Sequence, residues 1–275
     1  MNVKQLVGGM FAAAMMTGAV IAQEAEKNEW VPSLDLNLTY KSRYTSQGEV
    51  LNPKSMLFWD ATLSLKGFYV GVWFANDLND YNRDSKISHE PEEVDYYFGW
   101  GHTFKDDAFG ALEGISIDLG YTYWDMPKRS GWMAGQHDEY HVKANLECLL
   151  APGIEIDWDP RTERWYGNLN VSWSYDFAQS SEDLKGLSFD TGCKLYVKNN
   201  HKMGNWHHDN DLHFANLDWT YGFSYAFNEH VKLSVFGEMI FAIDPLERKY
   251  WKGEYDPNSK SGVNHVWGSN LNFSF

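Results

Sequence analysis

The feature that most limits how this chain can fold is a two-residue alternation of apolar and polar side chains, repeated in segments of about ten residues. Successive side chains of a strand point to opposite faces, so this period predicts β-strands rather than helices. Residues 213–227 show it most clearly, because Leu217, Trp219 and Tyr221 alternate there with small or polar residues. Each such strand would have one apolar face and one polar face.

Twelve segments of this kind follow residue 33. They are 34–44, 56–66, 68–76, 93–104, 115–124, 138–150, 154–159, 163–176, 186–197, 213–227, 230–242 and 263–275. An even number of antiparallel strands is what closes a bacterial outer-membrane barrel. Segment 68–76 is apolar on both faces, which leaves its facing open. Segment 154–159 is short, so ten strands remain an alternative in which this segment belongs to a loop.

The connections between these segments alternate in length, as the short inner turns and long outer loops of outer-membrane barrels do. The expected inner turns are 66–67, 105–114, 151–153, 177–185 and 228–229. The expected outer loops, mostly longer and rich in polar residues, are 45–55, 77–92, 125–137, 160–162, 198–212 and 243–262. Only the loop 160–162 breaks the rule by being short. The fold class we expect is therefore all-β, a transmembrane antiparallel up-and-down β-barrel spanning residues 33–275.

The two ends of the chain indicate export. Lys4 precedes an apolar run and a stretch of small residues that ends at Ala22, which is typical of a cleaved secretory signal peptide over residues 1–22. The alternative is an anchor helix, but the run is shorter than the ~20 apolar residues that span a bilayer. Residues 23–32 would form a short periplasmic segment. The last segment alternates up to Phe275 and is similar to the C-terminal signal read by the outer-membrane assembly machinery, a partner we expect.

Composition narrows the class further. The mean hydropathy of −0.50 excludes a helical membrane protein, and the net charge of −15 argues against nucleic acid as a partner. Cys148 and Cys193 lack the Cys-x-x-Cys spacing of metal sites. Export would permit a disulfide between them, and the sequence leaves their pairing open.

If the apolar faces meet lipid, the opposite faces line the interior. Strand parity then places thirteen acids and seven bases inside, a net negative lumen that favours cations. The lumen-lining charges we single out are Asp35, Asp60, Asp118, Glu139, Lys143, Asp157, Asp190, Lys194, Asp218 and Glu238. The hypothesis is an outer-membrane channel for passive diffusion of small solutes with a weak preference for cations. The alternative is a structural barrel plugged by opposed charges such as Lys143 and Asp118.

Two other classes of protein remain as alternatives. The first is a barrel enzyme that acts on lipid. A Ser-His hydrolase on one strand face favours His and Ser two residues apart, and none of the ten histidines has that neighbour. We therefore expect no enzyme and no catalytic residue. The second is a secreted soluble β-sandwich that binds carbohydrate, since its strands would also alternate.

A polar connection contains the weak metal-ligand candidates His201, His207, His208 and Asp209. Imidazole and carboxylate groups can bind Zn²⁺, Cu²⁺ or Ni²⁺. Their spacing matches no recognised site, so we expect no metal and no cofactor. The expected partners are small solutes together with outer-membrane lipid and lipopolysaccharide. A monomer is the default, because the sequence contains no coiled coil or other oligomerisation segment.

Several short aromatic and glycine-containing stretches in the first half of the mature chain resemble the TorF family of bacterial outer-membrane porins. They are Ser42-Arg43-Tyr44 with Gln47-Gly48, residues 67–73, Glu93-x-Asp95-Tyr96-Tyr97-x-Gly99, and Leu119-Gly120-Tyr121 with Tyr123. The family pattern has an Arg-Gly pair where this chain has Gln47-Gly48, so no role of that Arg is carried over. The resemblance implies a channel.

Overall fold

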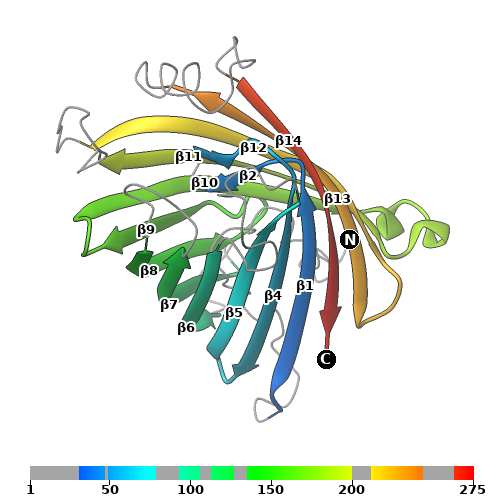
Figure 1. Cartoon of the computed structure of the whole chain (residues 1–275). Helices are drawn as coiled ribbons and strands as arrows, with labels where there is room; N and C mark the ends of the chain where they lie inside the picture. Colours follow the sequence, from blue (N-terminus) through cyan, green and yellow to red (C-terminus); the bar gives the residue numbers. More distant parts are fainter. Residues whose placement is uncertain are drawn as a thin grey trace.

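The computed structural model of the chain describes residues 31–46, 49–78, 93–105, 113–126, 135–199, 212–243 and 263–275. Twelve strands form one closed antiparallel barrel in which each strand pairs with its sequence neighbours. The first strand (blue) lies beside the last (red) and closes the ring (Figure 1). The expected signal peptide and the segment 23–32 fall almost entirely outside the described residues.

The barrel strands have the following bounds. They are β1 (Ser33–Lys41), β4 (Met56–Leu65), β5 (Phe68–Asp77), β6 (Glu93–Phe104), β7 (Gly114–Met126), β8 (Gly135–Glu147), β9 (Gly153–Asp159), β10 (Arg164–Asp176), β11 (Leu187–Asn199), β12 (Leu212–Ala226), β13 (Val231–Ala242) and β14 (Val263–Ser274). Strand β9 pairs with both β8 and β10, so the barrel has twelve strands and the ten-strand alternative is wrong. The predicted fold class is confirmed.

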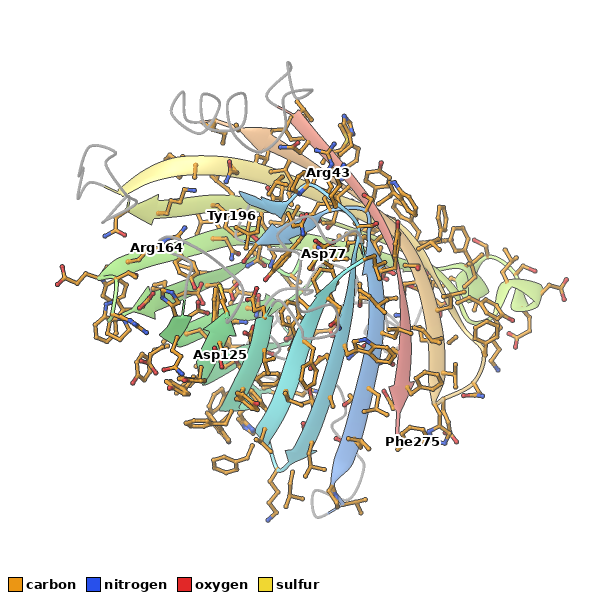
Figure 2. The ribbon with its side chains drawn as sticks, viewed as in Figure 1. Arg43, Asp77, Asp125, Arg164, Tyr196 and Phe275 are labelled. Carbon is orange, nitrogen blue, oxygen red and sulfur yellow. The ribbon has the colours of Figure 1, made fainter. Side chains whose placement is uncertain are left out.

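The alternation that predicted the strands also decides which way their side chains face. On β12, Trp219 and Phe223 are exposed on the outer surface, whereas Asp218 and Ser224 are buried. The facing of β5, which the sequence left open, is now clear: Phe68 and Val70 are exposed, and Tyr69 is buried. Exposed apolar and aromatic side chains project from the barrel wall (Figure 2). The result is an apolar outside and a largely polar inside.

The connection between β4 and β5 is a tight turn. Lys66 and Gly67 both have positive φ, 55° and 81°, as the two central residues of a type I′ hairpin turn require. The connection between β10 and β11 contains two short 3-10 helices, η4 (Phe177–Gln179) and η5 (Glu182–Leu184).

Within the described ranges, no helix has the length and apolar character needed to cross a membrane.

One outer connection differs from the prediction. Between β1 and β4, where the sequence predicted a plain loop, two short strands β2 (Tyr44–Ser46) and β3 (Glu49–Asn52) pair as an antiparallel hairpin. We call residues 44–52 the inner hairpin, because Tyr44 bonds to the inward face of β6 and Thr45 to that of β13.

Candidate functional site in the barrel interior

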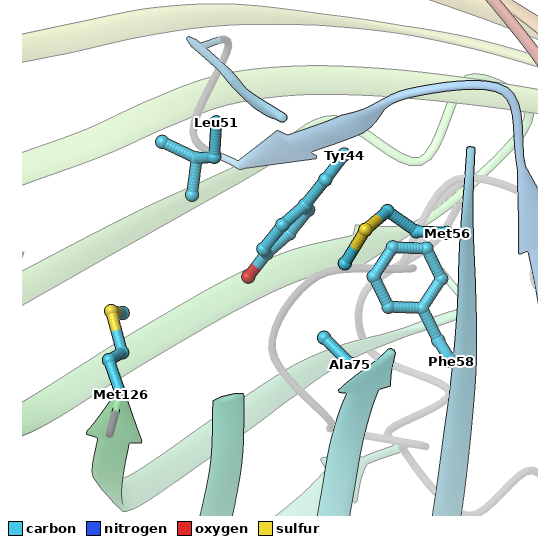
Figure 3. Packing of buried hydrophobic residues seen from close by; sticks show 6 residues of the cluster. All are labelled: Tyr44, Leu51, Met56, Phe58, Ala75 and Met126. Atoms are coloured by element: carbon cyan, nitrogen blue, oxygen red, sulfur yellow. The ribbon is translucent and has the colours of Figure 1, made fainter. Parts of the chain in front are cut away.

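The inner hairpin packs against the inside of the barrel wall. Tyr44 and Leu51 are buried in a cluster completed by side chains of β4, β5 and β7, namely Met56, Phe58, Ala75 and Met126 (Figure 3). The ring of Tyr44 lies 5.3 Å from the ring of Phe58 and 6.0 Å from that of Trp73. Burial of apolar surface therefore favours the inward position of this segment.

Hydrogen bonds tie the same segment to opposite parts of the wall. The Tyr44 hydroxyl donates to Glu93 Oε2 of β6 at 2.7 Å. On the other side, Thr45 Oγ1 donates to Glu238 Oε2 of β13 at 3.2 Å, and Lys41 Nζ donates to the same oxygen at 3.2 Å. A segment that contacts both β6 and β13 crosses the interior, so the inner hairpin narrows the lumen at the level of these residues.

A second group of charges lies on β8, β9 and β11. Lys143 Nζ lies 2.9 Å from Glu155 Oε1, and Lys194 Nζ lies 3.9 Å from Glu155 Oε2. The side-chain amide of Asn168 donates to Glu155 Oε2 at 2.7 Å. Glu155 is thus held by two cations and an amide, as a buried carboxylate must be.

Asp118 is not bonded to Lys143, the opposite charge that the plugged-barrel alternative paired with it. Its Oδ1 lies 2.6 Å from His141 Nε2 and accepts a hydrogen bond from the Tyr69 hydroxyl at 3.1 Å. Lys143 is its cross-strand neighbour, but the ammonium group contacts Glu155. These charges are bonded along the wall, to groups on the neighbouring strand or on the next strand but one.

The remaining lumen candidates are distributed as follows. Asp60 accepts hydrogen bonds from Tyr97 at 2.5 Å and Asn37 at 3.5 Å, Asp35 accepts from Ser274, and Asp190 accepts from Ser174 at 2.7 Å and Ser224 at 3.1 Å. Six of the ten candidates are buried, namely Asp118, Glu139, Asp157, Asp190, Asp218 and Glu238. Lys143, Lys194, Asp35 and Asp60 are partly buried. Their role as a pore lining stays a prediction.

Sequence reasoning missed three buried charged residues at strand ends, Asp77, Glu93 and Lys198. Strands β5 and β11 run to Asp77 and Asn199, one and two residues beyond the predicted ends, and Glu93 is the first residue of β6. Extending the inward parity to each strand end would have included them. Within the described ranges, ten Asp and Glu residues are buried against two lysines, so the buried charge is negative.

The described residues form neither a metal-binding cluster nor a disulfide. The weak metal candidates His201, His207, His208 and Asp209 lie outside them. In the part of the chain that the structure covers, no group of three or more His, Cys, Asp or Glu is arranged to hold a metal ion. Cys148 follows β8 and Cys193 lies in β11, and neither forms a disulfide.

Known structures are similar to this chain only at low sequence identity. No protein-family model matches the chain, and no curated protein matches it. Among solved structures, the KdgM porin is similar over 88% of this chain and 99% of its own, with 10% identity and a TM-score of 0.47. OpdL of Pseudomonas aeruginosa matches 89% of this chain and 98% of its own, with 11% identity and a TM-score of 0.40. OccAB4 of Acinetobacter baumannii matches 87% of this chain and 56% of its own, with 11% identity and a TM-score of 0.37.

Proposed function

We propose that this chain is an outer-membrane porin, a passive channel for small solutes that is narrowed by the inner hairpin and weakly prefers cations. The observation that carries the proposal is the closed barrel of twelve strands with an apolar, aromatic outside and a polar, charged inside. In lipid every backbone polar group needs a partner within the protein, and a closed barrel provides one for each strand.

The outer surface supports a location in a membrane. Five aromatic rings, four of them exposed and that of Tyr121 half-buried, lie side by side across β6 to β10 as direct cross-strand neighbours, with centroid distances of 5.2 to 5.8 Å. They are Phe98, Tyr121, Tyr140, Trp158 and Trp165. Amphipathic rings of this kind concentrate at the interfaces of membrane barrels. Export through the signal peptide and membership of the TorF family belong to the same proposal.

The cation preference rests on the sign of the buried charge. Ten buried carboxylates against two buried lysines in the described strands make the interior attractive to cations and repulsive to anions. The inner hairpin favours a second candidate function, that of a plugged structural barrel, because the hairpin occupies part of the interior between Glu93 and Glu238.

Planar-bilayer recording under a KCl gradient distinguishes the two. The porin proposal predicts discrete current steps. It also predicts a reversal potential whose sign shows that cations pass more easily than anions. A folded, heat-modifiable barrel that gives no steps would contradict it and favour the plugged barrel.

The cation preference has its own test in Asp190→Lys, which replaces a buried carboxylate by an ammonium group. We expect the reversal potential to shift toward anion preference. The control is Glu182→Lys, the same charge change in the exposed turn between β10 and β11. An equal shift, or none, in both variants would count against a selectivity set by the interior.

A further inference from the structure

Part of the interior wall carries polar atoms that are buried and have no hydrogen-bond partner. They are Glu139 Oε1, Asp157 Oδ1, Tyr166 Oη, Asp218 Oδ1 and both side-chain amide atoms of Asn216. About nine in ten or more buried polar groups in proteins are bonded, so a group of unbonded atoms calls for an occupant. Tyr166 is 6% exposed and Asn216 is 0% exposed, so this observation does not depend on the acids alone.

These atoms belong to neighbouring strands. Glu139 lies on β8, Asp157 on β9 and Tyr166 on β10, and Tyr166 is the direct cross-strand neighbour of Asp157. Asp157 is the direct cross-strand neighbour of His141, which lies two residues from Glu139 on the same face of β8. We call Glu139, Asp157, Tyr166, Asn216 and Asp218 the acidic wall.

Tyr196 of β11, labelled in Figure 2, links the two ends of the acidic wall. Its side chain is buried, and Tyr196 lies two residues from Lys198, the direct neighbour of Tyr166, and two from Lys194, the direct neighbour of Asp218. Asn216 lies two residues from Asp218 on β12, so both point to the same face of that strand. The unbonded atoms of β8, β9, β10 and β12 therefore face one region of the interior.

Three of the nearby lysines contact other carboxylates, and Lys198 is also buried here, as the direct cross-strand neighbour of Tyr166. Lys143 and Lys194 both contact Glu155, and Lys41 contacts Glu238. Three carboxylates of the acidic wall thus each keep a buried oxygen without a hydrogen-bond donor. An ammonium group offers three donors and a positive charge, which is the complement of such oxygens.

The other groups of the wall suit an organic cation. The ring of Tyr196 offers a face that attracts an ammonium group, as the ring of Tyr166 does for Arg164, whose Cζ lies 5.2 Å from its centroid, and the Asn216 amide offers one more acceptor. The described residues contain no cluster suited to a metal ion. The carboxylates also stand in two places, Glu139 with Asp157 at one end and Asp218 at the other, which matches a molecule with a charge at each end.

We infer that the acidic wall is a binding site for small aliphatic diamines, which would make such cations preferred solutes of the channel. This inference deepens the proposed function and rests on it, because the ligand has to enter the barrel. Each ammonium group would donate hydrogen bonds to the carboxylates of one region, and the alkyl chain between them would lie along the Tyr196 ring.

Isothermal titration of the folded protein in detergent micelles with 1,4-diaminobutane tests the site. We expect saturable binding, and at least tenfold weaker binding by the double variant Glu139→Gln/Asp157→Asn. The neutral isostere 1,4-butanediol should give no binding. The control variant Glu182→Gln/Asp183→Asn removes two carboxylates from an exposed turn and should bind as the wild type does.

Absence of saturable binding by the wild type, or equal affinity in the wild type and the double variant, would overturn the site. Heat-modifiability in SDS gels shows whether each variant is folded. If the double variant does not fold, Asp218→Asn and Tyr166→Phe replace it, and unchanged affinity in both would overturn the site equally. Bilayer recording separates the two ideas: a conducting channel that binds no diamine leaves the porin proposal standing and removes the site.

Discussion

At the scale of single residues, the barrel wall is built around glycines that make room for rings on the neighbouring strand. The ring of Tyr97 lies over Gly71, and the hydroxyl of Tyr69 lies over Gly99. A Cβ atom at Gly71 would come within 2.2 Å of Tyr97 Cζ. The ring positions matter for the interior, because Tyr97 donates to Asp60 and Tyr69 donates to Asp118.

These pairs also give a physical meaning to the motifs that resemble TorF proteins. Gly71, Tyr97, Gly99 and Gly120 all belong to those motifs, and in the structure they lie on adjacent strands β5, β6 and β7. The sequence displayed the residues but not their contacts, because each ring meets a glycine more than twenty residues away. The composition of the motifs could be read from the sequence, and their packing could not.

The first prediction concerns Gly71→Ala. The added methyl group displaces the Tyr97 ring and weakens its hydrogen bond to Asp60, so we expect a loss of about 1–3 kcal/mol in the free energy of unfolding, the usual cost of overpacking. Urea titration of the protein in lipid vesicles measures it. Gly101→Ala is the control, since the only atom that a Cβ there meets within 3.5 Å is Asp118 Oδ2, at 3.1 Å, so much less has to move. Equal stability of the two variants would contradict this account of the glycines.

At the scale of elements, the long strands could be predicted and the inner hairpin could not. A strand of ten or more residues repeats its period several times, as β12 does over fifteen residues. Strands β2 and β3 have three and four residues, too few to show a period. Their position depends on Glu93 and Glu238, which are distant in sequence. The sequence therefore predicted the charged residues that line the interior, but not the segment that narrows the lumen.

The second prediction concerns this segment. Replacing residues 44–52 by a short Gly-Ser linker removes the buried Tyr44 and Leu51 from the interior, so the unit conductance in planar bilayers should rise severalfold. Cation preference should persist, because the wall carboxylates remain. The matched control replaces the exposed residues 182–185 in the turn between β10 and β11 and should leave conductance unchanged. Unaltered conductance in the hairpin variant would mean that another part of the chain limits the flow.

At the scale of the whole molecule, barrel closure brings the last residue next to the first strand. The backbone of Phe275 exchanges two hydrogen bonds of 2.9 Å with Leu34, which extends the pairing of β1 with β14 to the very end of the chain (Figure 2). The ring itself is 63% exposed and stacks on His230. The backbone of this residue serves closure, and its exposed ring is free to serve recognition.

The third prediction separates these two roles. Phe275→Ala keeps both backbone bonds and removes only an exposed ring, so unfolding in vesicles should change by no more than about 0.5 kcal/mol, as for surface substitutions. If the ring is part of the signal read by the assembly machinery, the same variant should accumulate poorly as a folded, heat-modifiable species in the outer-membrane fraction of cells. Trp267→Ala removes another exposed ring from β14 and should assemble normally. Normal accumulation of Phe275→Ala would assign the terminal ring to surface packing alone, whereas loss in cells with retained stability in vesicles would assign it to recognition.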